Sequence, residues 1–472
     1  MRRARAAANP THPALADAEP RCFWLDRPGA PVPAPPLEGA CEADLLVVGA
    51  GFTGLWAALL AKEAEPAREV ALLEAETVAF GASGRNGGFV SASLTHGLSN
   101  GLERWPAQMP LIERLGRENH AALVAAIERH GIDAELEQHG ALSVATEPHQ
   151  LAWLGEMARQ ARRFGWSSDV LDRDATQAQV RSPTYLGAVW QRDGEALVDP
   201  AALAWGLAGA IRRLGVRVFE RTTVRQLRRD GAGVRAATAA GTVRARRAIL
   251  ATNAFPPLVR QVRRFIAPVY DYVLVSEPLD AAQRAAIGWA GRQGVSDLGN
   301  QFHYYRLTPD DRILWGGYDA IHYYGSRVAP ALDQRAASFD LLARNLLATF
   351  PQLEGIRFTH RWGGAIDTCS RFSVMFARAL GGRAVYVGGF TGLGVGASRF
   401  GALTALDLVD DRQTERTGLE LVRRRPVPFP PEPLRSLGIE ITRRELARAD
   451  RNGGRRGPWL RTLDRLGMGF DS

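Results

Sequence analysis

Three glycines near the start of the chain carry the first chemical signal. Gly49, Gly51 and Gly54 form the pattern G-x-G-x-x-G, with Phe52 and Thr53 between the last two glycines. Such a turn, when it joins a strand to a helix, brings backbone N–H groups and the helix N-terminus close to a pyrophosphate. The pattern therefore predicts a bound dinucleotide. The alternative is a glycine turn without a ligand.

An acidic residue follows at the spacing that such a site requires. Glu74 lies twenty residues after Gly54, and Ala75 comes next. A carboxylate at this point accepts hydrogen bonds from ribose hydroxyls and repels a 2′-phosphate. The dinucleotide is therefore expected to be NAD or FAD rather than NADP.

A second glycine-rich loop, residues 81–88, favours FAD. Its sequence GASGRNGG offers more backbone N–H groups and side-chain donors than an NAD site needs. Its polar residues could bind the pyrophosphate, and its last two glycines leave room for an isoalloxazine ring. The alternative is a flexible surface loop. The candidate cofactor contacts are Ser83, Gly84, Arg85, Asn86, Gly87 and Gly88.

A third glycine-rich turn, residues 388–396, precedes the last helix of the α/β pattern. A helix N-terminus carries partial positive charge, which would stabilise the negative charge of a reduced flavin. The alternative is a plain strand–helix turn. The candidate contacts here are Gly389, Phe390, Thr391, Gly392, Gly394 and Val395.

The elements around these turns predict an α/β domain. Residues 45–48 read as a strand, residues 55–64 as an amphipathic helix and residues 69–73 as a second strand, which is a β-α-β unit. Further strands of the same sheet are expected between residues 216 and 250. A strand at 384–387, followed by a helix from about 395 to 408, repeats this α/β pattern.

A different pattern between these parts predicts a second domain. Residues 269–277, 302–307 and 312–317 read as antiparallel strands. We therefore expect a Rossmann-like α/β FAD-binding domain, discontinuous in sequence, with an α+β second domain whose antiparallel sheet binds substrate. The expected division is a Pro-rich arm at 1–40, the FAD-binding domain at 41–110, 190–255 and 360–420, the substrate domain with a helical insert at 111–189 and 256–359, and an Arg-rich tail at 421–472.

Composition and charge exclude several classes of protein. The chain has 472 residues, 46% of them hydrophobic, which is enough for a large core. Its three cysteines are too few and too widely spaced for a disulfide framework or a Cys-rich zinc site. Of the net charge of +9, the tail supplies +6, from twelve Arg against six Asp and Glu. Because these charges are interspersed, we expect the tail to pack along the body rather than to bind nucleic acid.

The N-terminus and the apolar segments point to the cytoplasm. Met1-Arg2-Arg3-Ala4-Arg5 has the charge of a signal peptide, but no apolar stretch follows it. No window approaches the roughly 18 apolar residues that a membrane span needs. The histidine spacings fit no compact metal motif, so no metal is expected. Within the Pro-rich arm, Phe23-Trp24-Leu25 should dock on the body.

On these motifs the sequence resembles the glycine/D-amino acid oxidase family of FAD-dependent oxidoreductases, and within it the bacterial γ-glutamylputrescine oxidase-like branch. The resemblance spans nearly the whole chain. It is carried by DLLVVGAGFTG, LLEAETVAFGASGRNGG, ALVDPAALA, ILATNAF, YYRLTPDDRILWGG and GGFTGLGVG.

The resemblance implies a two-domain flavoprotein with non-covalent FAD. It assigns the dinucleotide end to the first glycine turn and Glu74, the flavin end to the second and third turns, an adenine contact to the backbone of Val224, and further contacts to Ala251 and Thr252. Cys369 could be considered for a covalent flavin, but a buried structural thiol is the better interpretation.

The chemistry that the resemblance implies is removal of a hydride from the carbon beside an amine to flavin N5, followed by hydrolysis of the imine. The electrons would pass to O2 or to a carrier. Some relatives use a lysine near the flavin to promote the reaction with O2, whereas Lys62, the only lysine here, is expected on the solvated surface. An alternative is therefore a dehydrogenase that oxidises a hydroxy acid or amino acid and reduces a carrier.

The sequence names only weak candidates for substrate contacts. Alternation sends Tyr304 and Arg306 to one face of a strand and Tyr305 to the other. Arg306 could clamp a substrate carboxylate, or it could pair with Asp310 or Asp311. Trp362 could line the cavity or fill the core. No catalytic residue can be named.

Overall fold

The computed structural model describes residues 9–469, and its first sheet grows from the predicted β-α-β unit. Strand β1 (Gly39–Val48) passes through the glycine turn into α1 (Phe52–Ala64) and returns as β2 (Val70–Leu73), parallel to β1. Residues 45–48 of β1 and the whole of β2 are short, buried apolar runs, which is typical of parallel strands covered on both faces.

Eight strands make up this first sheet, in the order β17-β18-β11-β1-β2-β8, with β10 and β9 continuing from β11. The central pairs are parallel, whereas β9, β10 and β17 are antiparallel to their neighbours. The remaining strands of the sheet are β8 (Arg217–Phe219), β9 (Gln226–Asp230), β10 (Gly233–Ala237), β11 (Gly241–Leu250), β17 (Met375–Ala379) and β18 (Ala384–Gly388).

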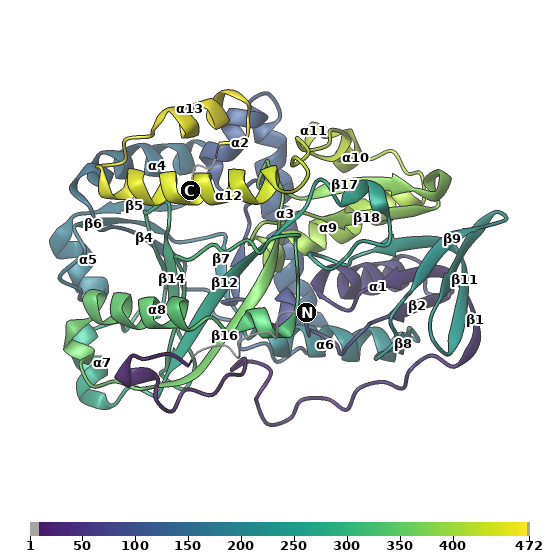
Figure 1. The fold of residues 1–472 in the computed structure, drawn as a ribbon, viewed down its shortest axis with the longest axis horizontal. Coiled ribbons are helices and arrows are strands. Elements are labelled where there is room, and N and C mark those ends of the chain that lie inside the picture. Colours follow the sequence, from purple (N-terminus) through teal and green to yellow (C-terminus); the bar gives the residue numbers. More distant parts are fainter. Residues whose placement is uncertain (1–8, 470–472) are drawn as a thin grey trace.

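Helices cover the first sheet and build its core. Helix α1 packs against α6 (Pro200–Arg213) and α9 (Gly394–Val409), and α9 also packs against α3 (Met109–Arg129). The predicted cap is present at α6, where the Asp199 carboxylate accepts hydrogen bonds from the N–H groups of Ala201 and Ala202 at 2.8 and 3.0 Å. Figure 1 shows α1, α6 and α9 beside the strands β1, β2 and β11.

The second sheet also has eight strands, in the order β16-β12-β15-β14-β13-β4-β6-β5. Its pairs are antiparallel except for β13 with β4. One face packs on α8 (Ala336–Thr349), with α5 (Arg173–Gln179) and α7 (Ala281–Ile287) nearby. The strands are β4 (Ala141–Ala145), β5 (Ser168–Leu171), β6 (Gly187–Gln191), β12 (Ala267–Ser276), β13 (Gly294–Asp297), β14 (His303–Leu307), β15 (Ile313–Gly317) and β16 (Phe358–Thr368).

Strand β16 differs from the expected division of the chain. Residues 360–420 were assigned to the FAD-binding part, yet β16 pairs along its whole length with β12 of the second sheet. The chain crosses to the first sheet only after residue 368, because β16 belongs to a long antiparallel ribbon with β12. Strands β3 (Phe89–Ser91) and β7 (Glu195–Leu197) form a third, two-stranded sheet. Each of them occurs where the chain passes from one large sheet to the other, and β3 contacts α9.

The tail packs along the body, as its charge pattern predicted. After α10 (Glu415–Gly418) and α11 (Glu420–Arg423), helices α12 (Leu434–Arg451) and α13 (Pro458–Arg465) lie together near α2 (Leu98–Arg104) and α4 (Leu151–Arg163) (Figure 1). The Asp450 carboxylate fixes α12 by accepting hydrogen bonds from the backbone N–H groups of Asn300 and Gln301, at 2.8 and 3.0 Å.

The N-terminal arm runs extended along the body and docks through its aromatic segment. Trp24 is fully buried, and its indole N–H donates to the carbonyl of Asn86 at 2.9 Å. Burying such a side chain stabilises the docked arm by about 2–3 kcal/mol. The signal-like start, Met1 to Arg5, lies outside the described residues. Among the helices of residues 9–469, none has the length and apolar character to cross a bilayer.

Candidate active site

The dinucleotide turn is packed so closely that only glycine fits. A Cβ at Gly54 would lie 1.9 Å from the carbonyl oxygen of Gly49. Gly49 itself has a φ of +106°, and a Cβ there would lie 2.5 Å from the carbonyl oxygen of Ala251. The turn therefore brings β1, α1 and the end of β11 together, as a dinucleotide site requires.

The second glycine-rich loop lies directly on the first. The N-cap residue of α1 is Gly51, which has no side chain to satisfy the helix N-terminus. Instead, the N–H of Phe52 donates to Oγ of Ser83 at 2.9 Å. The predicted partners of a pyrophosphate, the α1 N-terminus and Ser83, are thus in contact.

Glu74 lies beside the same turn. One carboxylate oxygen accepts from the N–H of Ala50 at 2.6 Å, the other from the N–H of Glu76 at 2.9 Å, and the backbone of Ala75 also contributes. Burial raises the pKa of Glu74 despite these bonds. Each oxygen keeps a lone pair for a ribose hydroxyl.

Residues 81–88 are held from within and from the second sheet. The side chain of Asn86 donates to the carbonyls of Ala82 and Ser83 at 3.0 and 2.9 Å and accepts from the N–H of Gly88 at 2.8 Å. Arg85 forms an ion pair with Asp333 at 2.7 Å. Both side chains therefore shape the loop, so the contacts left for a phosphate are mainly backbone groups.

The third glycine-rich turn is capped by a residue that the sequence did not indicate. The carboxylate of Asp367, at the end of β16, accepts from the N–H of Gly389 at 2.5 Å and of Phe390 at 3.2 Å. Burial raises the pKa of Asp367 to about 7. Thr391 has a φ of +52° and donates to the carbonyl of Gly389 at 3.0 Å, which tightens the turn before α9.

A cavity of about 1160 Å³ adjoins the second and third turns. It is bounded by the second sheet on the face opposite α8, and by α12 and α13 of the tail, which contribute Leu437, Ile441 and Leu463. The predicted cofactor residues that line it are Phe52, Thr53, Ser83, Arg85, Asn86, Gly87, Phe390, Thr391, Gly392, Gly394 and Val395.

The remaining predicted cofactor residues lie around the same region. Ala251 and Thr252 follow β11 and touch the Gly49 turn. The Thr252 hydroxyl is buried without a hydrogen-bond partner among the residues described, so it is free for a ligand. Val224 is buried just before β9, two residues after Thr222, whose N–H donates to the Glu74 carbonyl at 2.7 Å. Close-packed glycines, a helix N-terminus that contacts Ser83 and this hydroxyl without a partner fit FAD.

Tyr304 is the predicted substrate residue that the structure places at the cavity. Its hydroxyl donates to the Asp271 carboxylate at 2.5 Å, and both residues line the cavity. A Cβ at Gly87 would lie 2.6 Å from the Tyr304 ring, so the loop of residues 81–88 touches this side chain. Burial raises the pKa of Asp271 to about 6, opposed by the hydrogen bond from Tyr304 and by backbone N–H groups.

Two other candidates belong to the core. Tyr305 points to the opposite face of β14, where its hydroxyl shares a hydrogen bond of 2.5 Å with that of Tyr185. Trp362 is 1% exposed, and its indole N–H donates to the carbonyl of Arg85 at 2.8 Å. Trp362 thus supports the glycine-rich loop from behind instead of lining the cavity.

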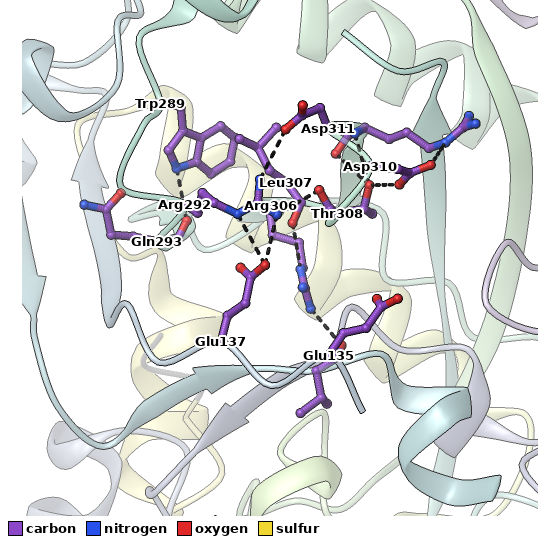
Figure 2. A network of polar contacts seen from close by, with 12 residues as sticks. Glu135, Glu137, Trp289, Arg292, Gln293, Arg306, Leu307, Thr308, Asp310 and Asp311 are labelled. Carbon is purple, nitrogen blue, oxygen red and sulfur yellow. Dashed lines mark hydrogen bonds and ion pairs between the residues drawn. The ribbon is translucent and has the colours of Figure 1, made fainter. Parts of the chain in front are cut away.

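Arg306 is enclosed by protein and is not positioned as a substrate clamp. It is 0% exposed, and its guanidinium donates to the carbonyl of Val198 at 2.7 Å. Figure 2 shows it directed away from Asp310 and Asp311, so the alternative pairing does not form either. Burial lowers the pKa of Arg306 to about 10, and the nearby Glu137 opposes this.

The acidic partners predicted for Arg306 are used by other arginines. Arg292 binds Glu137 at 3.0 Å and Asp311 at 3.3 Å, and Arg312 binds Asp310 at 2.6 Å. A Cβ at Gly88 would lie 2.8 Å from Arg306. The Arg306 side chain therefore fills the space between β14 and Gly88 of the glycine-rich loop.

Lys62 is buried rather than solvated. It is 8% exposed in the last turn of α1, and its Nζ donates to the carbonyls of Pro66 and Arg68 at 2.5 and 3.2 Å. The segment after α1 folds back over the helix end, where carbonyl groups favour a cation. Among the residues described, the lining of the cavity includes no lysine.

All three cysteines are buried free thiols. Cys369 donates to the carbonyl of Ser373 at 3.1 Å, beside the third glycine-rich turn. This placement agrees with the expected structural thiol. Within residues 9–469, no group of three metal-ligating side chains is assembled.

The fold and the site define a class of protein: a dinucleotide-binding domain joined to an antiparallel sheet over one large cavity. The family model described as FAD dependent oxidoreductase (DAO) matches residues 44–406. The chain belongs to this family of FAD-dependent oxidoreductases and is an enzyme.

Individual proteins agree with the family. The chain is 34% identical over 367 residues to gamma-glutamylputrescine oxidoreductase of Escherichia coli K12, covering 76% of this chain and 82% of that protein. Glycine oxidase from Geobacillus kaustophilus has a similar structure, with a TM-score of 0.66, 21% identity and coverage of 79% and 96%. L-Proline dehydrogenase from P. horikoshii also has a TM-score of 0.66, at 16% identity and coverage of 80% and 95%.

Proposed function

We propose that this flavoenzyme oxidises a C–N bond of a small amine or amino acid, with non-covalent FAD as the oxidant and the cytoplasm as its compartment. The similarity to gamma-glutamylputrescine oxidoreductase supports an amine substrate. Three free thiols suit a reducing compartment.

The observation that carries the proposal is the acidic wall of the cavity. Six carboxyl side chains line it: Glu113, Glu195, Asp271, Asp297, Asp319 and Asp367. Asp297 is paired with His303 at 2.9 Å and Asp319 with Arg335 at 2.8 Å, whereas the other four form no ion pair among residues 9–469. The arginines of the lining are bound to protein groups, Arg85 to Asp333, Arg443 to Glu440 and Arg435 to the Ser326 hydroxyl. The carboxyl groups without an ion pair can accept hydrogen bonds from an ammonium group, and their charged forms would disfavour the carboxylate of a hydroxy acid.

Bound FAD would supply the acceptor for the hydride that leaves the carbon beside the nitrogen. The chain's own residues position the substrate for this step. Asp271 supplies negative charge next to the loop of residues 81–88, and the Tyr304 hydroxyl orients its carboxylate. The amine loses a proton as the C=N bond forms, and water then hydrolyses the imine to a carbonyl compound and a free amine or ammonia.

A second candidate differs in the electron acceptor. Fast reduction of O2 is favoured by a positive charge near the flavin, and the only lysine, Lys62, is buried at the far end of α1. Solved structures of similar fold include both a glycine oxidase and an L-proline dehydrogenase. A dehydrogenase that passes electrons to a carrier is therefore the alternative to an oxidase.

An absorption spectrum of the purified protein tests both proposals. We expect flavin absorbance that bleaches when an amine or amino acid is added without air, and acid precipitation that releases the FAD. Rapid return of colour on admission of air supports an oxidase, and slow return supports a dehydrogenase. A coloured protein that hydroxy acids bleach and amines do not would overturn the proposed C–N oxidation.

A further inference from the structure

A second polar cluster lies on the cavity wall away from the Tyr304–Asp271 pair. Glu195 of β7 stands opposite Ser91 of β3, and its carboxyl accepts from the Ser91 hydroxyl at 2.7 Å. Its side chain is deep in the protein but partly open to the cavity. Among residues 9–469 it forms no ion pair, so its charged form has no compensating cation.

Glu113 extends this cluster from α3. It is 6% exposed, and its carboxylate accepts from the indole N–H of Trp166 at 2.7 Å. A Cβ at Gly194 would lie 2.5 Å from the Trp166 ring, so the residue next to Glu195 packs on the partner of Glu113. Glu195 and Glu113 therefore belong to one wall.

Ser168 provides independent evidence for a ligand at this wall. It is 3% exposed, and its hydroxyl is buried without a hydrogen-bond partner in the described part of the chain. On β5 it lies on the face opposite Leu171, which packs on the core below the sheet. Ser168 thus faces the cavity, opposite Gln191 of β6, which also lines it.

The cluster is remote from the other end of the cavity. Four strand spacings separate β5 from β14, the strand of Tyr304, which is roughly 19 Å. Ser91 comes four residues after Gly87, the glycine that touches Tyr304, which is about 13 Å along an extended chain. The wall between the two ends includes the small apolar side chains of Ala141 and Val189, together with Ser143 and Ser296.

We propose that Glu195, Glu113 and Ser168 form a subsite for a second, cationic amino group of the substrate, distinct from the amine that is oxidised. An ammonium group has three N–H donors, and this wall offers two carboxyl groups and a hydroxyl as acceptors. The small side chains of the wall between the two ends suit an aliphatic spacer. The substrate class is then an elongated amine with a remote ammonium group. This inference rests on the proposed function.

The electrostatics of the wall agree with a cationic ligand. Burial raises the pKa of Glu195 to about 8, so its carboxyl is largely protonated in the empty cavity at neutral pH. Burial also raises the pKa of Glu113, which the hydrogen bond from Trp166 opposes. A bound cation would favour the charged form, and Glu195 would release a proton on binding.

The test compares α,ω-diaminoalkanes of four to eight carbons with 1-aminoalkanes of the same length. Dissociation constants are measured by calorimetry without air, alongside flavin bleaching. Wild-type protein should bind the best diamine at least tenfold more tightly than its matched monoamine. Glu195→Gln keeps the shape and the bond from Ser91 but not the charge, and should weaken the diamine roughly ten- to a hundredfold.

Matched measurements separate the subsite from a general effect. Glu195→Gln should leave monoamine binding within about twofold, and it should abolish the diamine-specific proton release. Ser168→Ala should weaken the diamine by a smaller factor. Glu156→Gln, which removes an exposed carboxylate paired with Arg159 on α4, is the control and should change neither ligand.

Two outcomes overturn the inference, and a third overturns only the proposed function. Equal weakening of diamine and monoamine by Glu195→Gln would place Glu195 at the reacting amine, and no weakening of either would remove the subsite. Tight diamine binding that depends on Glu195 but never bleaches the flavin would overturn the proposed function while supporting the cation subsite. Failure of the two proposals is thus distinguishable.

Discussion

The two faces of the second sheet have opposite chemistry. On the face toward α8, Tyr305 stacks on Trp315 with ring centroids 4.3 Å apart and shares a hydrogen bond with Tyr185. On the cavity face, the next residue along β14, Tyr304, binds the carboxylate of Asp271. One face is filled with aromatic rings, and the other carries carboxyl groups whose burial is unfavourable without a ligand.

This difference shows where stability and function lie in the molecule. Close-packed aromatic contacts stabilise the fold, because each large side chain removes apolar surface from water. Buried carboxyl groups with raised pKa values cost stability, and such groups concentrate at functional sites. Substitutions on the α8 face should therefore affect unfolding, and those on the cavity face should affect pH dependence and catalysis.

The largest expected effect comes from the α8 face. Trp315→Ala removes a ring that packs on Tyr305, Phe350 and His303, and it leaves a cavity in the aromatic core. We expect a loss of about 3–5 kcal/mol in the free energy of unfolding, measured by urea denaturation. A loss below about 1 kcal/mol would contradict the assignment of this face as the stabilising core.

Glu195→Gln should change how stability depends on pH. The pKa of Glu195 is about 8 in the folded protein and near 4.5 in an unfolded chain, so the folded state holds the proton more tightly. Its contribution to stability is present below about pH 4.5 and is lost as pH rises to about 8. Across this pH range the free energy of unfolding of the variant should rise relative to that of wild type, by about a few kcal/mol at most. Thermal unfolding at pH 5 and pH 8 measures it, and Glu156→Gln is the control.

Asp271→Asn should give a smaller effect in a more acidic window. The pKa of Asp271 is about 6 instead of 3.8, so wild type loses stability as pH rises between these values. The variant should lack this loss, which amounts to about 2–3 kcal/mol. It should also lower kcat/KM for amines at neutral pH, because a negative charge beside the reacting end is removed. An unchanged kcat/KM would show that Asp271 has only a structural role.

The smallest effects come from the adjacent tyrosines of β14. Tyr305→Phe should cost about 1 kcal/mol of stability, through its bond with Tyr185, and leave kcat/KM unchanged. Tyr304→Phe should change stability by a similar or smaller amount but lower kcat/KM by about tenfold, since Asp271 loses its orienting partner. Equal kinetic effects of the two substitutions would remove the distinction between the faces.

Local sequence rules predicted the parts of the molecule that act within short segments. The turn at Gly49 to Gly54, the cap of α6 by Asp199 and the alternation of Tyr304, Tyr305 and Arg306 all depend on neighbouring residues. The family resemblance, also read from these motifs, is confirmed by the family model over residues 44–406. The assignment of individual cofactor contacts stays a prediction.

Long-range contacts defeated sequence reasoning elsewhere. Asp367 caps the third turn from a strand of the other sheet, and Asp271 of β12 binds Tyr304 of β14 across the one strand between them, β15. Arg306 was expected at a carboxylate, but it donates to the carbonyl of Val198 instead. Lys62 was expected in solvent, and this expectation failed over a short range, because the turn at Pro66 to Arg68 directs its carbonyls back onto the end of α1.

The sequence by itself determined the cofactor class and the nucleotide-binding framework, because glycine turns and strand–helix periodicity are set by backbone geometry within a few residues. Only the tertiary structure decided the character of the cavity. It brought acidic side chains from separate strands to one wall and laid α12 of the tail across it. Burial, charge and free hydrogen-bonding capacity depend on all the segments around a residue, and these are known only once the chain is folded.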